Sequence, residues 1–136
     1  MKKNSKIVNR SYIRKEYQDK KLRSRDYEFE LKLKEALNLY ETANYQEALE
    51  KLKYLKINND HFLIHWYLGH TYFKLFEYNL AIQSIKKSIQ LKSKDTLNLN
   101  FLAKLYKAIN KHDLAILSLE EALDLDTKNK NTLISL

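Results

Sequence analysis

The residues of this 136-residue chain that could bind a metal ion or transfer a proton are three nearby histidines, His61, His65 and His70. His61 and His65 are spaced i and i+4, which on a helix places both imidazoles on one face, as in helical zinc sites. A zinc-protease motif needs a glutamate directly after the first histidine, where this chain has Phe62. The sequence places no third ligand on that face, so we expect structural histidines, no metal and no cofactor.

Side chains for covalent or phosphate chemistry are also missing. The chain has no cysteine, no glycine-flanked serine and no glycine-rich loop, because Gly69 is its one glycine. Adjacent carboxylates such as Glu120 and Glu121 fall on a predicted helix, where such pairs usually form a solvated surface. The sequence therefore offers no basis for an enzyme, and we expect a binding protein.

The elements that carry these residues repeat along the chain at a constant interval. The positions of the first copy are Leu68, Gly69, Tyr72, Ala81, Ile85 and Ser88, and those of the second are Leu102, Ala103, Tyr106, Ala115, Leu119 and Ala122. A fixed period of about 34 residues predicts a pair of helices in each unit. We expect helices over 26–42, 45–57, 61–75, 78–91, 95–109 and 112–125. Asn and Asp, rather than Pro, are expected to form the turns, the last of them at 126–129.

The period and these residues resemble the tetratricopeptide repeat, a family of paired helices with a Leu-Gly, Tyr and Ala pattern. The resemblance implies an all-α fold, an α-α superhelix or solenoid over 26–136, with three repeats at about 28–61, 62–95 and 96–129. One departure concerns the tryptophan that the family places between the helices, which is His65 and Leu99 here. Trp66 comes directly after that position, and therefore points about 100° around the helix.

The resemblance also implies a binding site, because the first helix of each repeat lines a concave groove in this family. The groove residues on this chain would be Leu37, Tyr40, Trp66, His70, Phe73, Lys74, Asn100, Lys104 and Lys107. Grouped aromatic side chains are typical binding anchors, and lysines beside them favour a protein segment with acidic character. The alternative is that Trp66 and Phe73 pack against each other or against the N-terminal arm.

That arm, residues 1–25, carries the whole excess charge of +8, since the basic and acidic residues of 26–136 are equal in number. Its basic residues include Arg10, Arg14, Lys15, Lys20, Lys21, Arg23 and Arg25. A partial helix is expected over 11–23, where Tyr12, Ile13 and Tyr17 form a narrow apolar face that the charge of Glu16 interrupts. We consider three hypotheses for the arm: protein contact or simple solvation, binding of nucleic-acid phosphates, and contact with an anionic membrane surface.

The C-terminal end carries a further signal, because Leu133 and Leu136 come one repeat period after Leu99 and Leu102. We therefore expect 130–136 to begin another helix, too short to shield the helix before it. That preceding helix is apolar on more than one side, with Leu114, Ile116, Leu117, Leu119, Leu123 and Leu125. Leu133 and Leu136 would then contact another chain or a second copy, continue a longer solenoid, or fold down over a modest patch.

The sequence contains no secretory signal and no apolar run of about 18 residues, which a membrane-spanning helix needs. We therefore expect no membrane span and a cytoplasmic location. The function that we predict is a non-enzymatic adapter, scaffold or small chaperone that holds a protein segment in its groove. Two alternatives stay open, a nucleic-acid-associated accessory protein acting through the arm and a subunit of a larger assembly.

Overall fold

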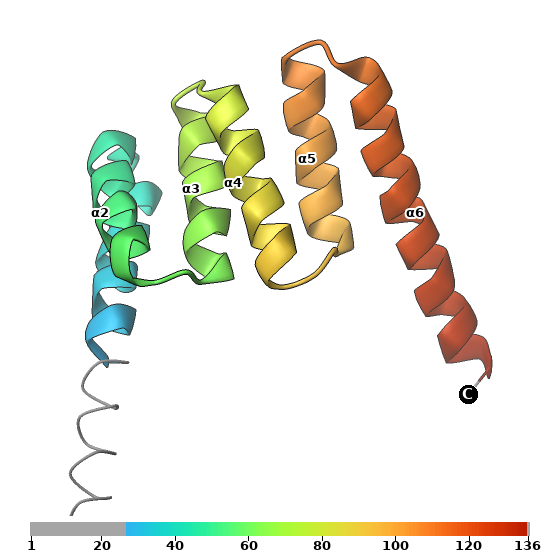
Figure 1. The fold of residues 1–136 in the computed structure, drawn as a ribbon, viewed down its shortest axis with the longest axis horizontal. Coiled ribbons are helices and arrows are strands. Elements are labelled where there is room, and N and C mark those ends of the chain that lie inside the picture. The colour runs from blue at the N-terminus through green and yellow to red at the C-terminus, as the bar shows by residue number, and fades with distance from the viewer. Residues whose placement is uncertain (1–26, 136) are drawn as a thin grey trace, which may run out of the picture.

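The computed structural model describes residues 27–135, with side chains described as far as Lys128. A first helix occupies 27–41. It is followed by α2 (Tyr45–Asn58), α3 (Phe62–Lys74), α4 (Tyr78–Leu91), α5 (Thr96–Ala108) and α6 (His112–Ser135). The fold is an all-α superhelix, and Figure 1 shows its helices standing in a row, from the blue helix of 27–41 to the red α6. The predicted all-α class is confirmed, and the ends of α2 to α5 differ from the expected bounds by at most a single position.

Apolar side chains at helical spacing hold neighbouring helices together. One cluster joins the first helix, α2 and α3 through residues that include Leu33, Leu52 and Ile64. A second joins α3 to α6 and includes Ile85 and Leu105, both completely buried. Burial of large aliphatic side chains contributes about 1.5–3 kcal/mol each to folding, so the successive layers are stabilised mainly by contacts with their neighbours.

The turn between the two helices of a pair has the same conformation each time it occurs. Ala43, Phe76 and Asn110 take positive φ angles of 64°, 63° and 62°, and they occupy equivalent positions of successive repeats. In each turn the next N–H donates back to a helix carbonyl, as in the bond from Glu77 to Tyr72 at 2.9 Å. Left-handed residues at this place end helices and satisfy their last carbonyls. These three turns achieve this without glycine.

The end of the chain differs from the prediction. α6 continues as one helix to Ser135, so the predicted turn at 126–129 is wrong, and residues 130–135 extend α6 instead of beginning another helix. The segment contains neither Gly nor Pro, and Asp, Thr and Asn lower helix stability by less than about 1 kcal/mol each. An ion pair of 3.1 Å between Lys128 and Asp124, one helical turn apart, favours continuation.

None of the described helices combines the length and hydrophobicity that are needed to span a bilayer.

Phe76 should limit the stability of this fold, because a bulky side chain in the left-handed region is strained. Phe76 is 76% exposed and its ring makes an edge contact with Tyr78 at 6.4 Å, so little packing offsets the strain. We expect Phe76→Asn to raise the free energy of unfolding by about 1 kcal/mol, because asparagine tolerates this conformation. Urea denaturation measures the difference. Phe76→Ala, which keeps the strained Cβ, is the control, and equal stability of the two variants would contradict the explanation.

Candidate functional site

Five rings from three helices form a continuous row of contacts, which we call the aromatic row: Trp66, His70 and Phe73 of α3, Tyr78 of α4 and Phe101 of α5. The ring centroids of Trp66 and His70 are 3.9 Å apart, and those of His70 and Phe101 are 4.0 Å apart. Phe73 lies 5.5 Å from Phe101 and 5.9 Å from Tyr78. All five side chains are partly buried, so the row forms part of the surface.

Helical periodicity accounts for most of this arrangement. Trp66, His70 and Phe73 are spaced i, i+4 and i+7, which places them on one face of α3. Phe101 occupies the repeat position of Tyr67 and comes from the next pair of helices. The row therefore lies across the junction between two pairs. His70 and Phe101 stand between Trp66 and Phe73, so these two side chains, whose direct packing was the alternative to a binding role, are connected through other rings.

A hydrogen bond fixes the indole of Trp66 across the same junction. Its Nε1–H donates to Oδ1 of Asn98 at 2.7 Å. Asn98 is buried, and its own N–H donates to the Asp95 carboxylate that caps α5. Neither Asn98 nor Phe101 is among the site residues predicted from the sequence. A signal for Asn98 was present, because it occupies the repeat position of the buried Ile64, and a buried amide needs a partner.

The electrostatics of the row centre on His70. Burial, followed by the charges of Lys104 and Lys74, lowers the pKa of its imidazole from 6.5 to about 4. Its Nε2 atom is buried without a hydrogen-bond partner among the described residues. The ring is therefore neutral at pH 7 and packs like another aromatic side chain.

Positive charge lies directly beside these rings. The ammonium nitrogen of Lys104 is 4.8 Å from the centroid of Phe73, within the range of a cation–π contact. Lys74 lies in the last turn of α3, directly after Phe73. Both lysines are exposed, so an approaching carboxylate could reach their ammonium groups.

The remaining predicted groove residues lie outside the row. Leu37 packs against the core cluster of the first helix and α2, and Tyr40 makes an edge contact of 5.4 Å with Tyr45. Asn100 and Lys107 are exposed on α5. Leu133 lies in α6 without a described side chain. The residues predicted to make contacts in the arm and at the chain end lie outside the described part of the chain. They are Arg10, Arg14, Lys15, Lys20, Lys21, Arg23, Arg25 and Leu136.

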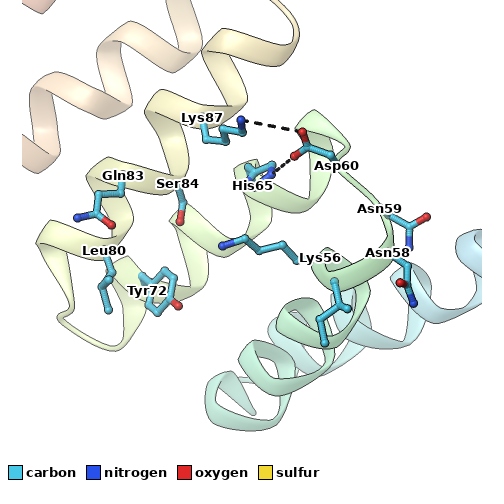
Figure 2. Close-up of a pocket in the computed structure, with 11 residues that line it drawn as sticks. Lys56, Asn58, Asn59, Asp60, His65, Tyr72, Leu80, Gln83, Ser84 and Lys87 are labelled. Carbon is cyan, nitrogen blue, oxygen red and sulfur yellow. Dashed lines mark hydrogen bonds and ion pairs between the residues drawn. The ribbon is translucent and has the colours of Figure 1, made fainter.

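His65 lines a separate cavity of about 540 Å³ between α2, α3 and α4. Figure 2 shows His65 and Lys87 directed toward the carboxylate of Asp60. Nε2 of His65 donates to Asp60 at 3.0 Å, and this bond, together with the charge of Lys87, lowers the pKa of that carboxyl. His61 accepts from the N–H of Leu63 and caps α3. These contacts give both imidazoles structural roles.

This cavity does not have the geometry of a hydrolase site in the part of the chain that is described. Ser84 lines it together with His65 and Asp60, but no hydrogen bond joins its hydroxyl to the imidazole there. The same residues contain no group of three His, Cys, Asp or Glu side chains that could hold a metal ion.

Comparison with known families agrees with this architecture. Residues 65–95 and 98–129 match the model of the tetratricopeptide repeat. This chain contains two tetratricopeptide repeats. The aromatic row therefore contains residues of both matched repeats. The match does not include 28–61, so the first repeat stays a prediction.

Solved structures share the fold. MamA superposes with a TM-score of 0.68 at 22% identity, over 78% of this chain and 63% of that one. A chain of the CopN–Scc3 complex gives 0.66 at 22% identity, over 69% of this chain and 56% of that one. The Yersinia enterocolitica type III secretion chaperone SycD, in complex with a peptide of the translocator YopD, gives 0.66 at 20% identity, over 78% and 86%. The chain thus spans less than two thirds of the first two structures. Among curated proteins no sequence matches.

The lowered pKa of His70 makes stability depend on pH. Between pH 6.5 and 4 the unfolded chain binds a proton at this residue and the folded chain does not, so the free energy of unfolding falls as the pH falls. We expect a loss of about 2 kcal/mol from pH 7 to 4.5, after allowance for the partial exposure of the ring.

Urea denaturation at the two pH values measures this loss in the wild type and in His70→Phe, where it should be absent. His112→Gln, at an exposed histidine, is the control and should behave as the wild type. An equal loss in His70→Phe would contradict the assignment to His70.

Proposed function

We propose that this tetratricopeptide-repeat protein is a non-enzymatic interaction module, an adapter, scaffold or small chaperone, that holds a segment of another protein against the aromatic row. The observation that carries this proposal is the row itself, built from two adjacent repeats with Lys74 and Lys104 beside it. Among the described residues no other connected set of rings is as large.

The row is suited to binding because its side chains are already ordered. Trp66 is held by its hydrogen bond to Asn98, and His70 is held between two rings. A ligand that contacts ordered aromatic side chains loses less conformational entropy than one that must order them. Aromatic anchors of this kind contribute a large part of the binding energy at protein interfaces.

The charges indicate the chemistry of the ligand. Lys74 and Lys104 are close enough to His70 to lower its pKa, so their positive potentials overlap at the row. A segment with an aromatic or aliphatic side chain and a nearby carboxylate would satisfy both features. His70 is neutral, so the aromatic row beside Lys74 and Lys104 carries no further charge. An apolar side chain of the ligand can therefore contact the row.

The structural relatives are consistent with this proposal at the level of fold. SycD is seen with a peptide of the translocator YopD, and another similar chain comes from the CopN–Scc3 complex. These structures show protein partners on related solenoids. They assign no contact residue to this chain, so the residues proposed here follow from its own geometry.

Capture of partners from native cell extract on the immobilised chain tests the proposal. We expect the variants Phe101→Ala and Lys104→Glu each to weaken capture of the bound protein by about tenfold or more, corresponding to at least about 1.4 kcal/mol. Tyr54→Ala and Lys111→Glu change an exposed aromatic residue and an exposed lysine away from the row, and should leave capture unchanged.

Trp66, the one tryptophan of the chain, allows the site to be identified directly. Titration with the purified partner should shift its fluorescence if the segment binds at the row. Capture that both row variants retain, or that disappears on nuclease treatment, would contradict the proposal, and the second result would favour the nucleic-acid alternative.

A further inference from the structure

A second surface of the molecule lies on α6. Ile116, Leu119 and Leu123 are spaced i, i+3 and i+7, which places them on one face of the helix. They are 54%, 49% and 67% exposed. No described residue covers them, and we call these three side chains the α6 face.

The repeat shows what this face is built to contact. The residues one repeat period earlier are Ile82, Ile85 and Ile89 of α4. Ile82 is 7% and Ile85 0% exposed, and Ile89 packs against the same cluster, which includes Leu102 and Leu105 of α5. The same three positions are thus buried or partly buried on α4, where Ile85 also contacts Gly69 of α3, and exposed on α6. An amphipathic helix is therefore the element that fits the α6 face.

The charged residues beside the α6 face differ in sign from those beside Ile82, Ile85 and Ile89 of α4. Lys86 of α4 lies with its ammonium 5.8 Å from the ring of Tyr106 in the covering helix α5. Glu120 takes its place on α6, and Asp113 and Asp124 replace the neutral Asn79 and Gln90. A helix docked on α6 therefore meets the carboxylate of Glu120 where α5 meets a lysine, and basic residues on that helix would be complementary.

The first helix of another copy does not fit this face. Asn38 and Thr42 of the helix over 27–41 and its following turn occupy the positions that Leu105 and Ile109 take in and after α5, and both are exposed. Head-to-tail stacking would therefore bury two polar side chains against the three apolar residues of α6, which costs free energy unless they find hydrogen-bond partners.

The basic arm of the same sequence has the complementary chemistry. Residues 1–25 contain ten Lys and Arg and two acidic residues, and Tyr12, Ile13 and Tyr17 would share a face of the helix predicted over 11–23. We propose that the α6 face binds the N-terminal arm, residues 1–25, of a second copy of this chain.

Docking within one chain is disfavoured by length. If the helix predicted over 11–23 forms, three residues separate it from residue 27, and a chain of that length spans at most about 10 Å. Figure 1 shows α6 at the opposite end of the row from the helix of 27–41, with α3 to α5 between them. Packed helices are about 8–10 Å apart, so this linker is too short to reach α6 of its own chain.

Sedimentation equilibrium of the full chain over a range of concentrations at low salt tests this proposal. We expect a mass above that of the monomer, which falls in the double variant Ile116→Lys, Leu123→Lys and on addition of excess synthetic peptide of residues 1–25. Leu97→Lys, at an exposed apolar residue of α5, is the matched control and should keep the higher mass. The labelled peptide should bind the double variant about tenfold more weakly than the control.

A monomer at every concentration, or association that the double variant retains, would overturn the proposal. Circular dichroism establishes that the variants are folded, and Glu120→Lys offers a second test that leaves the apolar residues intact and should also weaken association. Phe101→Ala, in the aromatic row, should not change the mass. If it alone abolished peptide binding, the arm would be assigned to the aromatic row and the proposal for α6 would be overturned.

Discussion

The close approach of the two helices in each pair is the constraint on which the rest of this structure depends. At Gly69 of α3, a Cβ atom would lie 2.5 Å from Cδ1 of Ile85 in α4, which is far inside van der Waals contact. The equivalent residues of the neighbouring pairs, Ala36 and Ala103, are also small and buried. Small side chains at this position let α3 and α4 pack closely, and the adjoining face of α3 can then present Trp66, His70 and Phe73 together.

Much of this arrangement can be predicted from the sequence because it is local. A constant repeat period with apolar side chains at helical spacing determines where α2 to α5 begin and end, and the same spacing places three of the rings on one face of α3. The end of α6 was predicted wrongly because the period was extended into residues 126–129, where nothing in the composition breaks a helix. Weak turn formers such as Asp and Asn end a helix only when packing also requires it.

The site features that could not be predicted from the sequence depend on contacts between repeats. Phe101 joins the row because α5 brings its ring against His70 and Phe73 of α3. Asn98 orders the site because its amide oxygen accepts a hydrogen bond from the indole of Trp66 in the preceding repeat. The pKa of His70 likewise depends on its burial between neighbouring helices and on lysines from two helices. None of these follows from a single helix, although an asparagine at an otherwise apolar repeat position was a clue.

The hydrogen bond between Trp66 and Asn98 has a consequence for how the solenoid unfolds. In a linear array, stability is approximately the sum of the intrinsic stability of each repeat and the coupling between neighbours. This bond and the contact of His70 with Phe101 belong to the coupling between the repeats of 65–95 and 98–129, not to either repeat alone. A molecule that occupies the aromatic row would therefore strengthen the coupling itself. The two repeats would then unfold more nearly as one unit, so ligand binding would change the cooperativity of unfolding as well as its free energy.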